Sequence, residues 1–105
     1  MTTISSLKTK TGQIYRFRVT GDLSDLPVAP GIYCFTFPQQ FPSAPITPIY
    51  WGKAADDFRS EICNDPRLRE AFDHGAIHVG TLVVKHRRAQ KRILDDLIAS
   101  FPPET

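Results

Sequence analysis

Alternating apolar and polar residues predict four strands in this chain. Residues 13–19 alternate aromatic or aliphatic side chains with arginines, which is the pattern of a half-buried strand. Residues 31–37 carry apolar side chains at nearly every position, so we expect a strand that is buried on both faces. Residues 49–51 and the β-branched stretch 76–84 predict two more strands. The first twelve residues are small and polar, and we expect them to fray.

Apolar residues at helical spacing predict three helices. The first covers Ala54 to Cys63 and carries aspartates at positions 56 and 57, where a negative charge suits the N-terminus of a helix. A second, short helix is predicted from Pro66 to Phe72, because proline is well placed in a first turn. The third runs from Arg87 to Phe101 and is ended by the prolines at 102 and 103.

A long proline-rich loop separates two of the predicted strands. Pro38, Pro42, Pro45 and Pro48 lie between residues 37 and 49. Proline fixes φ and donates no hydrogen bond, so we expect an extended loop that joins these strands in a hairpin. The order β-β-β-α-α-β-α predicts an α+β domain, and we expect one domain over residues 1–105.

Composition excludes few functions. The chain has 105 residues, 41% hydrophobic and 23% charged, with a net charge of +2, which indicates one modest core and no general attraction to nucleic acid. Cys34 and Cys63 belong to no CxxC pair and no leader-like segment precedes them, so we expect reduced thiols and a cytoplasmic location. No apolar run approaches the roughly 20 residues that cross a bilayer, so no membrane role is predicted.

A dense basic cluster marks the start of the last predicted helix. It consists of Lys85, His86, Arg87, Arg88, Lys91 and Arg92. Arg88, Lys91 and Arg92 would share one helical face and contact a nucleic-acid backbone without reading its sequence. The alternative is a solvated helix face, and Asp95 and Asp96, one turn further on, would weaken its potential.

Two other groups of residues suggest sites that we do not predict. Cys63, His74 and His78 are zinc-ligand types, but no fourth ligand is evident. Pro42-Ser43-Ala44-Pro45 fits a polyproline-type ligand, although a stiff connection is the simpler interpretation.

Two short motifs, taken together and in order, carry a family resemblance. Pro30-Gly31-Ile32-Tyr33 enters one predicted strand, and Ile49-Tyr50-Trp51-Gly52-Lys53-Ala54 leaves the next. The pair resembles the motifs that name the GIY-YIG nucleases. The resemblance implies a small three-stranded antiparallel sheet flanked by helices, with residues 30–105 as the family-like core and residues 1–26 as an N-terminal extension that adds one strand.

The resemblance also implies metal-dependent cleavage of DNA. Tyr33 and Tyr50 match the two motif tyrosines, one of which would activate the nucleophile, and Lys53 matches a lysine often found after the second motif. In the family an arginine on the first helix stabilises the phosphoryl transition state, and a glutamate on a later helix holds one Mg²⁺ or Mn²⁺. Without the resemblance, Tyr33 is more simply a core aromatic residue whose hydroxyl finds one partner.

Two positions depart from the family pattern. Aligned on the apolar residues, Glu61 stands at the arginine position and Leu94 at the metal-binding glutamate. Arg59 is the candidate replacement, although two residues along a helix is a rotation of roughly 200°. Asp95, next to Leu94, points about 100° away.

The candidate residues therefore form two sets. The catalytic candidates are Tyr33, Tyr50, Lys53 and Arg59. The candidates for nucleic-acid backbone contacts are Arg87, Arg88, Lys91 and Arg92. No metal ligand is identified. Two functions stay open, a DNA endonuclease and a catalytically inactive module that binds nucleic acid or another protein, and the sequence does not indicate an oligomeric state.

Overall fold

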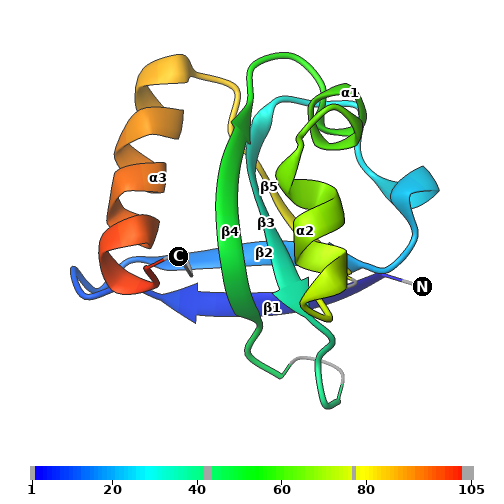
Figure 1. Cartoon of the computed structure of the whole chain (residues 1–105). Coiled ribbons are helices and arrows are strands. Elements are labelled where there is room, and N and C mark those ends of the chain that lie inside the picture. The colour runs from blue at the N-terminus through cyan, green and yellow to red at the C-terminus, as the bar shows by residue number, and fades with distance from the viewer. Residues whose placement is uncertain (1, 42–43, 77, 103–105) are drawn as a thin grey trace.

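The computed structural model describes residues 2–41, 44–76 and 78–102. Within this part the chain forms a five-stranded sheet, three α-helices and one short 3-10 helix, η1 (Figure 1). The strands are Thr2–Lys8 (β1), Ile14–Thr20 (β2), Gly31–Phe37 (β3), Thr47–Ala54 (β4) and His78–Val83 (β5). The helices are Leu23–Asp25 (η1), Phe58–Cys63 (α1), Arg67–Asp73 (α2) and Arg87–Ser100 (α3).

The sheet is antiparallel throughout and has helices on both faces. Its strand order is β1-β2-β5-β3-β4, so β3 lies between β5 and β4. Figure 1 shows α1 and α2 on one side of β3 and β4, and α3 on the other. One core cluster joins α1 and α2 to the sheet through Phe58 and Ile62, and a second joins α3 to it through Leu97. The predicted α+β class is confirmed.

The predicted three-stranded sheet with one added strand is wrong, because residues 2–8 form a fifth strand instead of fraying. Strand β1 pairs with β2 from Thr2↔Thr20 to Lys8↔Ile14. Its inward positions include a serine, Ser5, which is 1% exposed. A polar residue at a buried position hides the alternation that predicts strands from sequence.

Ser5 fastens β1 to the segment that precedes β4. Its hydroxyl donates to the Ala44 carbonyl at 3.0 Å and accepts from the Ile46 N–H at 3.1 Å. A second link, a hydrogen bond between Thr3 and Gln39, lies nearby. The first strand of the sheet is therefore bonded to the segment just before β4, the strand at the opposite edge of the sheet. In Figure 1, β1 passes behind the lower part of β4.

Strand β4 is longer than its sequence predicts, and the first helix is shorter. Pro48 lies inside β4 instead of in the preceding loop, which an edge strand tolerates, and a register shift lies beside it between Phe35 and Thr36. Lys53 belongs to β4 and not to a helix start. Helix α1 begins only at Phe58, because the Asp57 side chain accepts from the Arg59 N–H and caps it.

The other predicted elements are close to their observed bounds. Helix α2 follows Pro66, and α3 ends one residue before Phe101. The last strand begins at His78, and position 77 of the predicted stretch lies outside the described residues, as do Pro42, Ser43 and the chain after residue 102. The alternative of a polyproline ligand at 42–45 therefore falls partly outside the described chain.

Replacement of Ser5 by alanine tests the link between β1 and the segment before β4. The change leaves the buried Ile46 N–H without its acceptor, which costs about 1–3 kcal/mol of unfolding free energy. Ser6→Ala is the matched control, because Ser6 is the exposed neighbour on the same strand. Urea denaturation of both variants measures the difference, and equal stabilities would show that the Ser5 bonds contribute nothing to the fold.

Candidate functional site

The strand register separates the catalytic candidates onto two faces of the sheet. Tyr33 stands opposite Gly52 and Phe35 opposite Tyr50, so both tyrosines point to the face covered by α1 and α2, since opposite residues of paired strands share a face. Lys53 stands opposite Ile32, which packs in the cluster beneath α3. The structure therefore places Lys53 on the other face from the two tyrosines.

Tyr33 packs against the backbone of β4. Its side chain is 3% exposed, and a Cβ added at Gly52 would lie 2.3 Å from its Cζ atom. Only glycine fits at position 52 while the ring stays where it is. The Tyr33 hydroxyl donates to Asp65 Oδ2 at 2.6 Å, across to the segment between α1 and α2.

Asp65 joins Tyr33 to an arginine that the sequence interpretation did not select. Arg67 donates to this carboxylate from Nε at 3.1 Å and from Nη2 at 2.9 Å, and its backbone N–H adds a third bond. The guanidinium carbon lies 5.7 Å from the centre of the Tyr50 ring, within the range of a cation–π contact. We call Tyr33, Tyr50, Asp65 and Arg67 the tyrosine cluster.

The protonation states of the tyrosine cluster follow from burial and from these bonds. Burial, then the bond to the Asp65 carboxylate, raises the pKa of Tyr33 well above its ordinary value. Burial opposes ionisation of Asp65, but the bonds from Arg67 and Tyr33 outweigh it and lower the Asp65 pKa. The carboxylate in turn raises the pKa of Arg67. At neutral pH the hydroxyl keeps its proton, and the Arg67 charge faces Asp65.

Arg59 does not join the tyrosines. It is exposed on α1, and its Nη2 atom donates to the Ser24 carbonyl in η1 at 2.8 Å. Glu61 is exposed on the same helix. The arginine beside the tyrosines is Arg67 on α2, and the only sequence signal for it is the Asp-Pro-Arg step at the start of that helix.

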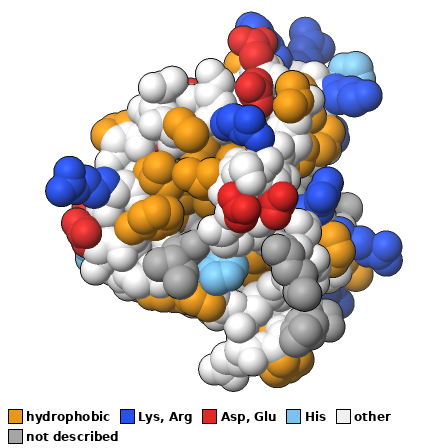
Figure 2. Space-filling view, turned by 90° about the vertical axis from the view of Figure 1, so that its right-hand side faces the viewer, with side chains coloured by type: hydrophobic (Ala, Val, Ile, Leu, Met, Phe, Trp, Pro, Cys, Tyr) orange, Lys and Arg blue, Asp and Glu red, His pale blue; other side chains and the backbone are white. Residues whose placement is uncertain are grey.

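The opposite side of the molecule gathers exposed cations. Arg87, Arg88, Lys91 and Arg92 are all exposed on α3, and no acidic residue occupies the first turn of this helix. Strand β4, whose last residues include Lys53, contacts α3. On the side of η1 and α2, by contrast, Figure 2 shows cations scattered around a hydrophobic area. We call residues 85–92 of α3 and its approach the basic face.

The basic face is held in place by buried contacts. Gln90 is 2% exposed, and its Nε2 atom donates at 2.7 Å to the carbonyl of Val84, the residue after β5. Leu97 is fully buried against the sheet. A hollow of about 340 Å³ is lined by Arg88, Lys91, Arg92 and Asp95, and Lys91 pairs with Asp95 at 3.1 Å with both side chains mostly exposed. The predicted helical face of Arg88, Lys91 and Arg92 is thus present.

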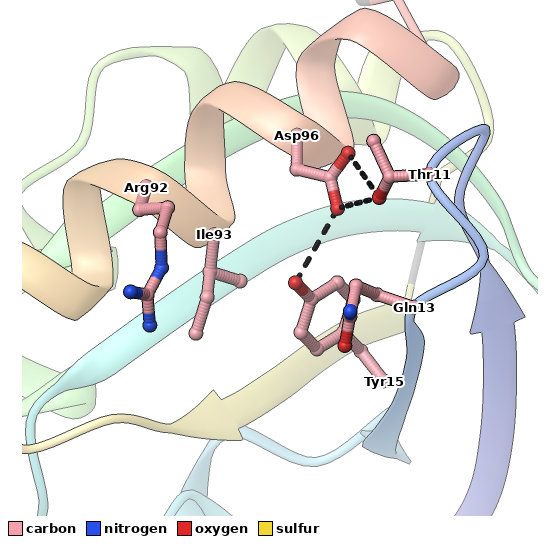
Figure 3. Close-up of a pocket in the computed structure, with 6 residues that line it drawn as sticks. All are labelled: Thr11, Gln13, Tyr15, Arg92, Ile93 and Asp96. Carbon is pink, nitrogen blue, oxygen red and sulfur yellow. Dashed lines mark hydrogen bonds between the residues drawn. The ribbon is translucent and has the colours of Figure 1, made fainter.

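A second hollow lies between α3 and the β1–β2 hairpin (Figure 3). It has a volume of about 540 Å³ and is lined by Thr11, Gln13, Tyr15, Arg92, Ile93 and Asp96. The Asp96 carboxylate accepts from the Thr11 hydroxyl at 3.1 Å and from the Tyr15 hydroxyl at 3.3 Å. Burial, then the Asp96 charge, raises the pKa of Tyr15. We call this hollow the hairpin pocket.

The position implied for a metal ligand does not fit a divalent cation. Leu94 is an apolar side chain packed against the cluster beneath α3, whereas Mg²⁺ and Mn²⁺ take oxygen ligands. In the described ranges no three His, Cys, Asp or Glu side chains lie close enough to hold an ion. Cys34 and Cys63 are free, as expected, and Cys34 is buried.

Comparison with known proteins finds no match to this chain among protein-family models, curated proteins or solved structures. Within the described residues, no helix has the length and apolar character of a membrane span.

Acid titration tests the electrostatics of the tyrosine cluster. A carboxyl whose pKa is lowered by folding stabilises the fold above its unfolded pKa, about 3.9, and loses this contribution as pH falls through the lower folded value. Asp65→Asn is therefore expected to be less stable than the parent at pH 7, with a difference that shrinks below about pH 4. Unfolding free energies measured between pH 2 and 7 give both curves.

Asp56→Asn provides the control for this titration, because Asp56 is an exposed carboxylate just before α1. It is expected to lose less stability at pH 7 than Asp65→Asn, because the Asp65 carboxylate accepts bonds from Tyr33 and Arg67, whereas Asp56 is exposed. A constant difference between Asp65→Asn and the parent across the whole range would contradict the assigned charge on Asp65.

Proposed function

We propose that this chain is a nucleic-acid-binding domain, similar in sequence motifs to the GIY-YIG nucleases, that binds the phosphate backbone through the basic face without cleaving it. The observation that carries the proposal is that Lys, Arg or His occupies six of the eight positions from 85 to 92, all six exposed on one end of α3 and its approach. The net charge of the whole chain is only +2, so this segment is far more basic than the rest of the chain.

The start of α3 adds backbone donors to these charges. His86 occupies the N-cap position and its side chain makes no capping bond. The first N–H groups of a helix have no partner within it, and they carry partial positive charge. Arg87 and Arg88 follow directly, and the guanidinium fork fits phosphate oxygens. Backbone amides and arginines together favour phosphate at this position.

Lys53 extends the basic face toward the sheet. It is exposed, it belongs to the sheet face covered by α3, and it lies near the end of β4. Its strand contacts α3 directly. A phosphate strand that crosses the start of α3 would therefore meet Lys53 as a further contact, which gives this residue a binding role in place of the catalytic one implied by the motif.

The tyrosine cluster supports binding without cleavage. The Tyr33 hydroxyl donates a hydrogen bond to Asp65 and its pKa is raised, so the hydroxyl stays protonated, which disfavours both a general base and a nucleophile at this atom. The Arg67 fork is engaged by the same carboxylate, so it is not free for a phosphate.

A metal-dependent DNA endonuclease is the second candidate, favoured by one observation. Arg67 lies beside both Tyr33 and Tyr50, so an arginine accompanies the motif tyrosines although Glu61 replaces the arginine expected on the first helix. In this function a phosphate would displace Asp65 from Arg67, and Mg²⁺ or Mn²⁺ would take ligands other than Leu94. If neither nucleic-acid binding nor cleavage is found, the remaining function is a module that binds another protein.

Removal of two charges from the basic face is expected to weaken DNA binding. The Arg87→Ala, Arg88→Ala double variant should bind several-fold more weakly at low salt. The slope of log affinity against log salt should fall by about 1 for each phosphate that the variant no longer neutralises. Arg16→Ala, Arg18→Ala is the charge-matched control, because both residues are exposed on β2 and away from α3. Equal weakening in the two variants would contradict a specific role for the basic face.

Incubation with supercoiled plasmid separates the two candidate functions. The proposed binding domain should give no nicking with Mg²⁺ or Mn²⁺ and should bind equally well in the presence of a chelator. Nicking that disappears in Tyr33→Phe and in Arg67→Ala would establish the endonuclease instead. The Tyr33→Phe variant keeps the ring against Gly52, so a loss of activity would come from the hydroxyl.

A further inference from the structure

The hairpin pocket combines a fixed anion, a free cation and an aromatic ring in one hollow. Figure 3 shows Asp96 and Tyr15 on one side of Ile93 and the Arg92 guanidinium on the other. The hollow of about 540 Å³ lies within the range of roughly 300–1,000 Å³ typical of small-molecule sites. Its polar groups come from two elements, the β1–β2 hairpin and α3, that are distant in sequence.

The Asp96 carboxylate has acceptor capacity left over. The hydroxyls of Thr11 and Tyr15 supply two hydrogens to it, whereas an ionised carboxylate has about four acceptor positions. These two bonds also hold the carboxylate in one orientation. The side chain is only partly buried, and the Thr11 hydroxyl bridges its two oxygens. A ligand with two N–H donors would therefore take the place of this hydroxyl, whereas a single donor could use a remaining position.

Arg92 is the free cation of this pocket. Among the described residues it makes no ion pair or hydrogen bond, whereas Lys91 is paired with Asp95. Arg92 lines both the hairpin pocket and the hollow on the basic face. The pocket therefore opens next to the surface that we propose for phosphate binding.

We propose that the hairpin pocket binds a guanine base presented by a nucleotide, with Asp96 accepting from its Watson–Crick edge and Arg92 contacting its phosphate. The inference rests on the proposed function, because the basic face brings the nucleotide to the pocket. The Tyr15 ring and the Ile93 side chain supply the apolar walls that a planar base requires.

The choice of guanine follows from the chemistry of a carboxylate. Asp96 accepts hydrogen bonds and donates none when ionised. The Watson–Crick edge of guanine presents two adjacent donors, N1–H and the N2 amino group, which match the two carboxylate oxygens once guanine displaces the Thr11 hydroxyl that bridges them. The Thr11 hydroxyl keeps a partner when displaced, because the Thr9 hydroxyl lies 2.9 Å away. Adenine and cytosine place a ring-nitrogen acceptor beside their amino group, and thymine flanks its single N–H with two carbonyls, so each of them would bring an acceptor against the carboxylate. A base pair would occupy the Watson–Crick edge that Asp96 contacts, so the guanine must be unpaired.

The test compares single-stranded oligonucleotides of about ten thymidines with and without one central guanine or adenine. Fluorescence anisotropy at low salt is expected to show about tenfold tighter binding of the guanine-containing strand by the parent protein, which corresponds to about 1.4 kcal/mol. Asp96→Asn should bind all three strands with equal affinity, close to that of the parent for oligothymidine. Asp95→Asn, the exposed neighbour with the same loss of charge, should keep the preference for guanine.

A second variant shows whether a lost preference for guanine comes from the pocket or from unfolding. A second ligand shows whether the pocket takes the base from a strand or from a free nucleotide. Gln13→Ala changes the pocket wall without touching the Asp96 bonds, and it should reduce the preference at unchanged thermal stability. Guanosine monophosphate, compared with inorganic phosphate, should shift the backbone amide signals of Thr11, Tyr15 and Ile93. Binding of the mononucleotide without a preference among strands would assign the pocket to a free nucleotide.

Two results would overturn this inference. They are equal affinity of the parent for all three strands with no response to guanosine monophosphate, and a preference for guanine that persists in Asp96→Asn. Failure of every strand to bind, with guanosine monophosphate still bound, would overturn the proposed function and leave the guanine pocket. Binding of every strand without base preference, and without a response to the mononucleotide, would overturn the guanine pocket and leave the proposed function.

Discussion

The close approach of the Tyr33 ring to the backbone of Gly52 is the constraint on which the centre of this structure depends. Because position 52 carries no side chain, the ring can lie directly against β4. The ring carries its hydroxyl to Asp65, which fastens the turn between α1 and α2 to the middle of the sheet. Asp65 in turn orients Arg67 over Tyr50. One face of the sheet is therefore closed by a chain of bonds in which both charged groups, Asp65 and Arg67, already have a partner.

The other face has the opposite character. Helix α3 is anchored by buried Leu97 and Gln90, and these contacts leave its cations pointing outward. Exposed charges close to one another repel, so a run of cations on a rigid helix costs stability unless an anion neutralises it. The ion pair of Lys91 with Asp95 relieves only one of them. Binding of a polyanion would relieve the others, which is why we propose a binding function for this face and a structural role for the tyrosine cluster.

The sequence predicted much of the fold and less of the site. Periodicity identified the helices and four strands, because their buried positions carry apolar residues. It missed β1, whose inward positions include Ser5, a residue that is buried through its bonds to another segment. The sequence predicted the hairpin of β3 and β4 but not the face of Lys53, since that depends on β4 continuing past Gly52. The position of Arg67 beside Tyr50 and the formation of the hairpin pocket depend on contacts between segments that are distant in sequence. Local sequence patterns do not predict such contacts.

The most direct test is to map the nucleic-acid contact on the folded protein. A ¹⁵N-labelled sample titrated with a short single-stranded oligonucleotide at low salt reports which backbone amides change. We predict that the largest changes lie at residues 85–92 and at Lys53, with little change around Tyr33 and Tyr50. Changes centred on Tyr33, Tyr50 and Arg67, with the start of α3 unaffected, would contradict it and return the tyrosine cluster to the role of a catalytic site.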